Sequence, residues 1–357
     1  VELPPSGATG HSVAVSAIAT TAGTPVPVGY GARERRAAAP SADERERQLF
    51  ERLPAALERA RERAPAIARQ LRGIEPAMLE SREALARVPV LRKSELLQTQ
   101  HAERIARAGG SADAERLRVF GGFSTIGWGA ARRVYASPGP IYEPEGPRPD
   151  YWGFARALHA AGVCAGMLVH NCFSYHFTPA GSMMETAAHA LGCTVFPGGV
   201  GQTELQVRAM ADLAPHAYTG TPSFLRIILE KADEMGVALP SLQRALFSGE
   251  AYPPSLQAWF RGRGIQGFQA YGSADLGMVA FETPAREGLV ANEDLILEIV
   301  RPGTGQPVPE GEVGELVVTT LNADYPLLRF GTGDLSALMP GVSPCGRTNL
   351  RIRGWLG

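Results

Sequence analysis

Small and acidic residues follow two apolar runs in the second half of the chain. Ala245-Leu-Phe247 leads into Ser248-Gly-Glu250, and a run from Ile265 to Ala270 leads into Tyr271-Gly-Ser-Ala-Asp275. Short apolar runs that end in glycine are typical of buried strands that deliver a loop. The acidic side chains and exposed backbone at these two ends could therefore contact a polar ligand.

The residues between the two runs predict how the ends are brought together. Pro253-Pro254 favour the start of a helix over residues 255–262, because proline fits the first helical turn. Two strands joined through a helix form a βαβ unit, and ligands of open α/β sheets sit beyond the carboxyl ends of the strands. We expect both glycine-containing ends to face one crevice.

Strand and helix patterns alternate over much of the chain, which predicts a layered α/β domain with parallel strands flanked by helices. After Thr283 the pattern changes to short strands separated by Pro-Gly and Glu-Gly turns, which indicates a β-rich subdomain. The predicted divisions are an N-terminal arm (1–40), a helical segment with the first strands (41–130), an α/β core (131–285), a β-rich subdomain (286–345) and a final segment (346–357).

Several motifs, taken in order, resemble the adenylate-forming enzymes, and in detail the phenylacetate–coenzyme A ligases. They are SGEAYPPSLQAWF, AYGSADLGMVAFET, GEVGELVVTTLNADYPLLRFGTGDL and MPGVSPCGRTNLRIRG, from Ser248 to Gly354. The segment around Pro89-Val-Leu-Arg-Lys93 resembles the same family less specifically. The resemblance implies a large adenylate-forming domain, in which residues 346–357 begin the hinge to a mobile C-terminal lid domain that lies outside this chain.

The resemblance also implies a nucleotide site. Gly249, Glu250 and Ala251 match the segment that lies against adenine, and Tyr271 matches the residue that stacks on it, since a flat ring packs on a flat purine. Gly272 matches the nucleotide-binding segment directly after it. Asp334 matches the carboxylate that holds the ribose hydroxyls, and Arg347 matches a nucleotide-side arginine. The alternatives are a core tyrosine, a turn aspartate and a surface arginine.

Three residues are implied to act on the reacting groups: Tyr271, Ser273 and Asp275. Asp275 stands where the family usually has a magnesium-binding glutamate, and a carboxylate suits Mg²⁺ although this one is shorter by a methylene. Ala274 replaces a usual hydroxyl.

The phosphate loop departs most from the family pattern. Its equivalent here is Ser137-Pro-Gly139-Pro-Ile-Tyr-Glu143-Pro144, in which prolines remove backbone donors and Glu143 stands where a lysine would face phosphate. Gly331 likewise stands where relatives often carry arginine. A rival loop, Gly121 to Gly129, has a suitable composition, but we interpret it as a strand-and-turn hairpin. No Walker A, dinucleotide or G-x-S-x-G motif occurs.

The acid pocket implied by the resemblance is rich in aromatic side chains, which favours an aryl or arylacetic acid. His176 is more simply a packed histidine than a base. The matching residues are Phe173, Tyr175, His176, Phe177, Gly199 and Ser223.

Composition limits the other classes of function. The formal net charge of -1 over 357 residues gives no electrostatic footprint for nucleic acid or a membrane surface. No apolar run approaches a membrane span, and the mildly apolar residues 13–28 do not read as a signal peptide. Four cysteines without a C-x-x-C spacing suit reduced thiols and a cytoplasmic protein, and we decline a zinc site at Cys345.

The sequence thus predicts an AMP-forming acid–thiol ligase that uses ATP and Mg²⁺, activates a small carboxylic acid and transfers it to coenzyme A. Two alternatives stay open. One is a degenerate relative that binds a nucleotide or acyl group without ligation, which Glu143, Ala274 and Gly331 favour. The other is loading of the acid onto a carrier protein. The oligomeric state, including a homodimer, is also open.

Overall fold

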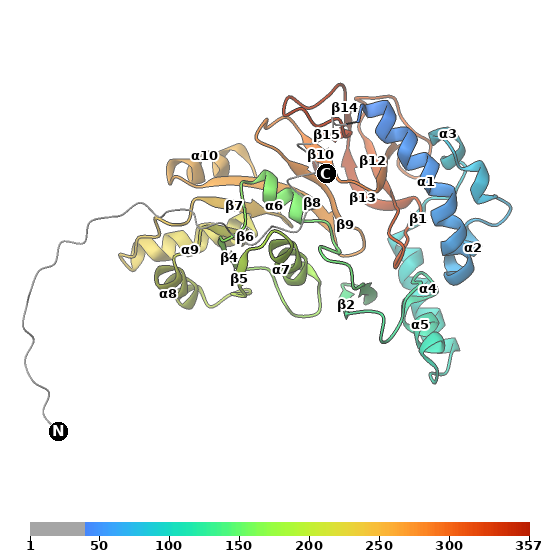
Figure 1. Ribbon diagram of the computed structural model, residues 1–357, viewed down its shortest axis with the longest axis horizontal. Coiled ribbons are helices and arrows are strands. Elements are labelled where there is room, and N and C mark those ends of the chain that lie inside the picture. Colours follow the sequence, from blue (N-terminus) through green and yellow to red (C-terminus); the bar gives the residue numbers. More distant parts are fainter. Residues whose placement is uncertain (1–39) are drawn as a thin grey trace, which may run out of the picture.

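The large sheet organises the molecule, as the computed structural model of the protein shows for residues 40–357 (Figure 1). Nine strands lie in the order β14-β15-β10-β9-β8-β7-β6-β4-β5. The five on one side are parallel: β4 (Leu168–Asn171), β5 (Thr194–Phe196), β6 (Ala217–Gly220), β7 (Arg244–Phe247) and β8 (Gln266–Ser273). The expected βαβ unit is confirmed, because β7 and β8 pair in parallel across α10 (Pro254–Gly262).

Helices cover both faces of the parallel half, which explains why its strands are apolar throughout. One face packs against α6 (Ala155–Ala160) and α7 (Ala180–Ala190), with Leu246 and Phe268 pointing into that core. The other face packs against α8 (Thr203–Leu213), α9 (Pro222–Glu234) and α10, with Tyr218 and Phe247 pointing into it. The carboxyl ends of β4 to β8 are thereby lined up along one edge.

Antiparallel strands extend the sheet toward the chain's last residues. They are β9 (Gly277–Glu282), β10 (Leu289–Ala291), β14 (Leu338–Met339) and β15 (Arg351–Ile352). Their apolar face packs against a second sheet, ordered β1-β13-β12-β11, whose strands are β1 (Leu91–Arg92), β11 (Leu295–Val300), β12 (Gly314–Thr320) and β13 (Phe330–Ser336). A separate hairpin is formed by β2 (Arg133–Ser137) and β3 (Ile141–Glu145).

The helices of the N-terminal segment are α1 (Ala42–Arg63), α2 (Pro65–Gln70), the 3-10 turn η1 (Pro76–Met78), α3 (Arg82–Leu85), α4 (Lys93–Ala106) and α5 (Ala112–Phe120). Those from α1 to α3 pack on the second sheet (Figure 1). Helix α1 begins at Ser41, whose side chain accepts a hydrogen bond from the Glu44 amide, and it continues through Pro54. Burial of Phe50, Leu53 and Leu57 on both sides of the proline keeps the helix intact.

One sequence-based expectation about an element is wrong. Residues 121–129 form a loop, not a hairpin: Gly121 ends α5 with φ 63°, and Thr125 bonds to the carbonyl of Asp324 instead of to a partner strand. Helix α6 begins only at Ala155, whose amide donates to the Asp150 carboxylate.

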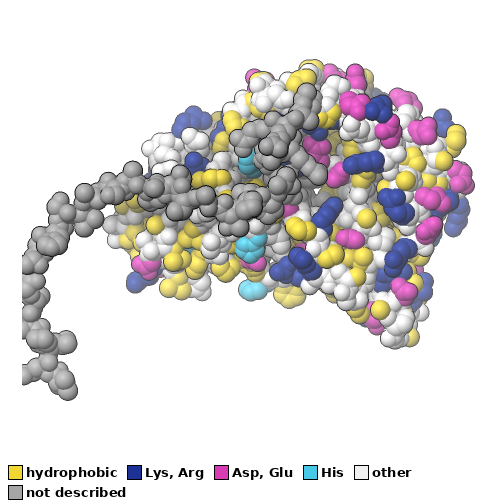
Figure 2. All heavy atoms as spheres, in the orientation of Figure 1, with side chains coloured by type: hydrophobic (Ala, Val, Ile, Leu, Met, Phe, Trp, Pro, Cys, Tyr) yellow, Lys and Arg dark blue, Asp and Glu magenta, His cyan; other side chains and the backbone are white. Residues whose placement is uncertain are grey.

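Charge is mixed over the visible surface. Figure 2 shows basic and acidic side chains interspersed over the N-terminal helices, with no field of one sign on that face. Within residues 40–357, no helix is both long and apolar enough to cross a membrane. The predicted N-terminal arm and the apolar residues 13–28 lie outside the described residues, apart from Pro40.

Candidate active site

A cavity of about 590 Å³ lies at the carboxyl ends of β7 and β8. The loop after β7 and the end of β8 form its inner side, and the segment after β15 closes it from the other side. The residues around it are Ser248, Gly249, Glu250, Ala251, Tyr252, Pro253, Gln269, Ala270, Tyr271, Gly272, Leu289, Asp334, Arg353, Gly354 and Trp355. Both strand ends singled out in the sequence therefore face one cavity.

Close packing at Gly272 gives this cavity its inner wall. A Cβ atom on Gly272 would lie 2.5 Å from the Gly277 carbonyl oxygen and 3.1 Å from the Phe154 ring, so a larger residue would push β8 away from β9. This contact keeps β8 close to β9 next to Tyr271.

Asp334 is held by two aromatic side chains at the cavity. The Tyr271 hydroxyl donates to Asp334 Oδ2 at 2.6 Å, and Trp355 Nε1 donates to Asp334 Oδ1 at 3.2 Å. Burial, together with the neighbouring Asp334 carboxylate, raises the pKa of Tyr271, so its hydroxyl remains a donor. Asp334 is thus arranged to accept two hydrogen bonds at once.

Arg347 lies apart from this cavity. Its guanidinium sits 5.6 Å from the centre of the Phe281 ring and donates to the Cys345 sulfur at 3.7 Å. The residues that surround the cavity include Arg353 instead. Sequence reasoning did not single out Arg353 and Trp355, which follow β15 and reach the cavity only in the folded chain.

The hairpin β2–β3 presents the residues expected at the phosphate end. Glu143 is fully buried, and the Ser137 hydroxyl donates to its Oε1 at 2.5 Å, while Oε2 has no hydrogen-bond partner among residues 40–357. Burial, with the Asp275 carboxylate adding to it, raises the pKa of Glu143 to about 8. The expectation that Glu143 carries a charge of the wrong sign is therefore corrected: the neutral acid predominates at pH 7.

Lys93 supplies a positive charge beside these carboxylates. Its Nζ donates to Asp275 Oδ2 at 2.9 Å, and its charge acts on Glu143 as well. Lys93 is the first residue of α4, where the helix dipole disfavours a cation. A lysine at such an unfavourable position is the sequence signal that could have pointed to a functional role for it. The preceding residue, Arg92, pairs with Glu315 and lies against Gly331, to which it is matched in the β1–β13 register. A Cβ on Gly331 would lie 2.8 Å from Arg92 Nη1, so a side chain from β1 fills the space that a residue-331 side chain would need.

Asp275 offers limited capacity for a metal. Its side chain is 1% exposed, Oδ2 carries the Lys93 ammonium, and Oδ1 has no hydrogen-bond partner within the described chain. No group of three or more metal-ligating side chains occurs within residues 40–357. One free carboxylate oxygen fits an Mg²⁺ ion that takes most of its ligands from substrate phosphates and water. The neighbouring Ser273 hydroxyl accepts a bond from the Leu276 amide and so shapes the turn that carries Asp275.

The residues expected around the acid are only partly brought together. Phe173 is buried in the core, and Tyr175 is tied by its hydroxyl to Asn171 Nδ2 at 2.8 Å. His176 is exposed, and Phe177 is 81% exposed, so neither lies in an enclosed pocket. The Ser223 amide donates to Glu250, which places the loop after β6 beside the nucleotide-side loop.

Asn171, which sequence reasoning did not consider, joins the loops after β4 and β6. Its side-chain oxygen accepts bonds from the Phe173 amide and the Thr219 hydroxyl, and its amide donates to the Gly181 carbonyl as well as to Tyr175. These bonds satisfy the polar backbone at the strand ends, where the ladder stops. The acid-side loops are therefore part of one hydrogen-bonded framework.

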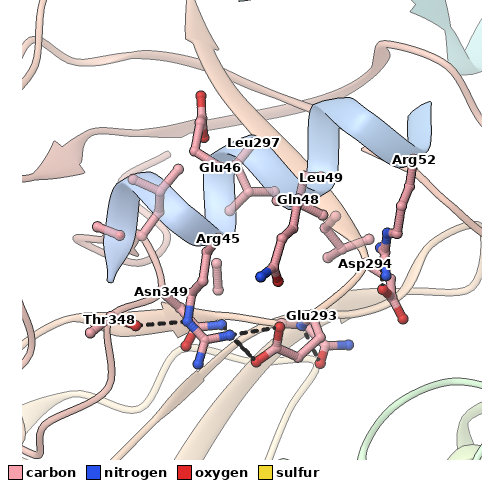
Figure 3. Close-up of a pocket in the computed structure, with 15 residues that line it drawn as sticks. Arg45, Glu46, Gln48, Leu49, Arg52, Glu293, Asp294, Leu297, Thr348 and Asn349 are labelled. Carbon is pink, nitrogen blue, oxygen red and sulfur yellow. Dashed lines mark hydrogen bonds and ion pairs between the residues drawn. The ribbon is translucent and has the colours of Figure 1, made fainter. Parts of the chain in front are cut away.

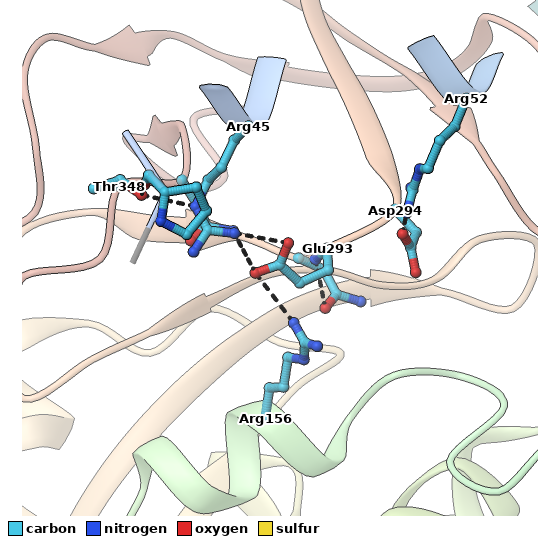
Figure 4. Close-up of polar contacts among 9 residues, drawn as sticks. Arg45, Arg52, Arg156, Glu293, Asp294 and Thr348 are labelled. Atoms are coloured by element: carbon cyan, nitrogen blue, oxygen red, sulfur yellow. Dashed lines mark hydrogen bonds and ion pairs between the residues drawn. The ribbon is translucent and has the colours of Figure 1, made fainter. Parts of the chain in front are cut away.

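A second hollow of about 90 Å³ lies between α1 and the start of β11 (Figure 3). Its charged side chains bind one another: Arg45 pairs with Glu293 at 2.7 Å and donates to the Thr348 hydroxyl, while Arg156 reaches Glu293 from α6 (Figure 4). Arg52 pairs with Asp294 nearby. This polar seam fastens α1 to the strands, and we assign it no ligand.

Comparison with known proteins identifies relatives of the cavity-bearing region. Residues 149–322 match the family model described as AMP-binding enzyme. The chain is 37% identical over 211 residues to phenylacetate-coenzyme A ligase of Thermus thermophilus, covering 57% of this chain and 47% of that protein. It is 33% identical over 218 residues to the Escherichia coli phenylacetate-coenzyme A ligase, covering 57% and 49% respectively.

Solved structures extend the similarity to most of the chain. A 2-hydroxyisobutyryl-CoA ligase in the postadenylation state, in complex with its acyl-AMP, superposes with a TM-score of 0.80 and 25% identity. This match covers 90% of this chain and 69% of that one. An open conformation of the same ligase in complex with acyl-AMP and CoA gives a TM-score of 0.78. The chain spans about half the length of the curated relatives that it matches.

Proposed function

Because this chain belongs to the AMP-binding, adenylate-forming enzymes, we propose that it forms the nucleotide- and acid-binding part of an ATP-dependent acid–thiol ligase. In the first half-reaction, a carboxylate oxygen of the acid attacks the α-phosphorus of ATP and pyrophosphate leaves. In the second, the thiol of coenzyme A attacks the acyl carbon and AMP leaves. The protein's task is to neutralise phosphate charge and to align two anions that repel each other.

Asp334, at the cavity beyond β7 and β8, is the observation that carries this proposal. A ribose has two adjacent hydroxyl donors, and Asp334 already accepts two bonds, one on each oxygen. We assign the ribose to Asp334 and the adenine to the space between Tyr271 and the Gly249–Ala251 backbone. The ribose must displace the Trp355 indole, which is the weaker of the two present donors by distance.

Arg92 and Lys93 support catalysis by this chain in spite of its altered phosphate loop. The two residues bring positive charge to the places where Gly331 and Glu143 provide none. Neutral Glu143 removes the electrostatic objection to phosphate binding at the hairpin. We assign the polyphosphate to this side, beside the hairpin that carries Ser137, Gly139 and Glu143, and we assign Arg353 as the nucleotide-side arginine in place of Arg347.

A bound Mg²⁺ would neutralise phosphate charge there, and Asp275 Oδ1 is the protein oxygen available to it. Lys93 would hold the other Asp275 oxygen and so orient the carboxylate. Ser273 would fix the turn that carries Asp275, and Tyr271 would orient the Asp334 carboxylate that binds the ribose.

The substrate class follows from the relatives and from the residues at the acid end. The curated relatives are named as ligases of phenylacetate. In this chain, aromatic side chains follow β4 at the strand edge that matches the acid site of the family. We therefore assign an aryl or arylacetic acid to the strand edge whose loops carry Phe173, Tyr175, His176, Phe177, Gly199 and Ser223, and binding must draw the exposed His176 and Phe177 inward if they are to contact it. Coenzyme A is the assigned acceptor, and the cytoplasm the assigned compartment.

Acid-dependent ATP–pyrophosphate exchange, measured with a panel of aryl and arylacetic acids, tests the proposal. We expect exchange with the wild-type protein and its loss, by at least about tenfold, in Lys93→Met, because a charged hydrogen bond beside phosphate is removed. Lys231→Met is the matched control, since Lys231 pairs with Glu234 on the exposed face of α9. Equal exchange in both variants would refute the role given to Lys93.

The degenerate alternative is favoured by Ala274, which lacks the hydroxyl that the family usually has at this position. It predicts calorimetric AMP binding without exchange for any acid. Loading of a carrier protein would instead give exchange without coenzyme A thioester. A homodimer would appear as twice the chain mass by light scattering.

A further inference from the structure

Gln206, on the first turn and a half of α8, holds the loop between β5 and α8 from beneath. The side chain is 3% exposed, and its Nε2 donates toward three carbonyl oxygens, those of Gly198 at 2.9 Å, Gly199 at 3.2 Å and Gly201 at 3.2 Å. The carbonyl groups of three of the four residues from Gly198 to Gly201 therefore point inward toward the same side-chain amide.

His170, on β4, fixes the orientation of that amide. Its Nε2 lies 2.6 Å from Gln206 Oε1, and because Oε1 can only accept, the imidazole carries its proton on Nε2. The His170 ring stacks on Phe196, the last residue of β5. Gln206 can thus present its Nε2 only to the loop.

The side of the loop that faces Gln206 and His170 is closely packed, and the opposite side is open. A Cβ on Gly198 would lie 2.5 Å from Gln206 Oε1 and 2.8 Å from His170 Nε2. At Gly199 and Gly201 a Cβ would meet nothing within 4 Å, and Val200 between them is 59% exposed. The loop is therefore pinned on its inner side and presents its outer side beyond the ends of the strands.

The loop also joins the framework at the acid end. The Gly199 amide donates to the Asn171 carbonyl at 3.0 Å, and the Asn171 side chain bonds to Phe173, Tyr175 and Thr219. Strands β5, β4 and β6 are neighbours, so their following loops lie side by side. Ligands of such sheets bind at this edge.

We propose that Gln206 is the positioning residue that fixes the Gly198–Gly201 loop as one wall of the acid site, and that it thereby determines which acids fit. The inference rests on the proposed ligase function. Gln206 itself touches no reacting atom, and it acts through the position of the loop.

Gln206→Met tests the inference, because methionine keeps the length of the side chain and removes all its polar contacts. Gln70→Met is the matched control: Gln70 also donates to two loop carbonyls, those of Pro89 and Leu328, but far from this edge. We would measure hydrogen exchange of residues 197–202, the KM and kcat of acid-dependent pyrophosphate exchange, and the Kd of AMP. In Gln206→Met we expect faster exchange of the loop and a KM for the preferred acid raised about tenfold, with kcat and AMP affinity within about twofold of wild type. Gln70→Met should leave all four unchanged.

Gln206→Glu adds a second variant that keeps an acceptor for His170 and loses the donor toward the carbonyls. We expect it to behave like Gln206→Met, and a wild-type acid KM in this variant would refute the role of the amide. If neither variant folds, wild-type hydrogen exchange decides: the acid with ATP should protect residues 197–202, and AMP alone should not.

Different results would refute the ligase function and the role of Gln206. No acid-dependent exchange by a wild-type protein that still binds AMP would refute the ligase function. An active wild type, with an unchanged loop and an unchanged acid KM in folded Gln206→Met, would refute this inference alone.

Discussion

Replacing Glu143 by glutamine should make the protein progressively more stable relative to the wild type as the pH rises. Glu143 is fully buried, and its pKa stands at about 8 against an ordinary value of 4.5. The folded state therefore holds a proton that the unfolded chain releases between these two values. Wild-type stability must fall as the pH rises through this window, and the loss is complete above the folded pKa.

The magnitude follows from the two pKa values. A difference of 3.5, from 4.5 to about 8, corresponds to roughly 5 kcal/mol over the whole window. Between pH 5 and pH 8 the loss is roughly 3 to 4 kcal/mol, because part of the window lies outside these limits. The amide introduced by Glu143→Gln cannot ionise, so the difference in free energy of unfolding, variant minus wild type, should grow by that amount.

Chemical denaturation of both proteins at pH 5, 6, 7 and 8 measures this growth. The absolute offset at pH 5 reports the exchange of the Ser137 bond, and only the change with pH is diagnostic. Glu310→Gln, the same substitution at an exposed turn, is the control. A constant difference for Glu143→Gln would refute the conclusion that Glu143 is neutral at pH 7.

Asp334→Asn should weaken AMP binding by at least about tenfold in calorimetry, because a charged acceptor of both ribose hydroxyls is lost; unchanged affinity would place the ribose elsewhere. Arg329→Met should lower the free energy of unfolding by about 3 to 5 kcal/mol, because it leaves the buried Glu298 carboxylate unpaired, whereas Arg329→Met combined with Glu298→Leu should recover much of that loss. Burial lowers the pKa of His170, so folded protein resists its protonation and stability should fall as the pH drops below about 6.5. His170→Phe should flatten that acid-side slope in denaturation curves, and an unchanged slope would contradict a buried, neutral His170.

Local signals in the sequence were enough to predict the α/β class and the βαβ unit around the cavity. An apolar strand, two prolines at a helix start and a glycine at each strand end are all encoded within about 30 residues. The same reasoning placed Gly249 and Tyr271 at one cavity before its shape was known. These features depend on neighbours in sequence, so they can be read without the fold.

Contacts between distant parts of the chain could not be read in this way. Lys93 meets Asp275 across 182 residues, and no local pattern reports that pairing. The neutral state of Glu143 depends on burial, which only the assembled core creates. Gln206 likewise gains its importance from three carbonyls and a histidine that come together only in the folded chain.

The seam that fastens α1 has a consequence for how the chain folds during synthesis. Arg45 is separated by 248 residues from Glu293, and by 303 from Thr348. At the usual elongation rates, a ribosome needs roughly 10 to 50 s to add the first of these intervals. During that time the apolar residues of α1 can pack only with their neighbours from Ala64 to Val88, because Ile296 and Leu328, which complete the cluster, have not been made. Helix α1 therefore completes its packing only after these later residues have been made, and until then part of its apolar face stays open to a chaperone.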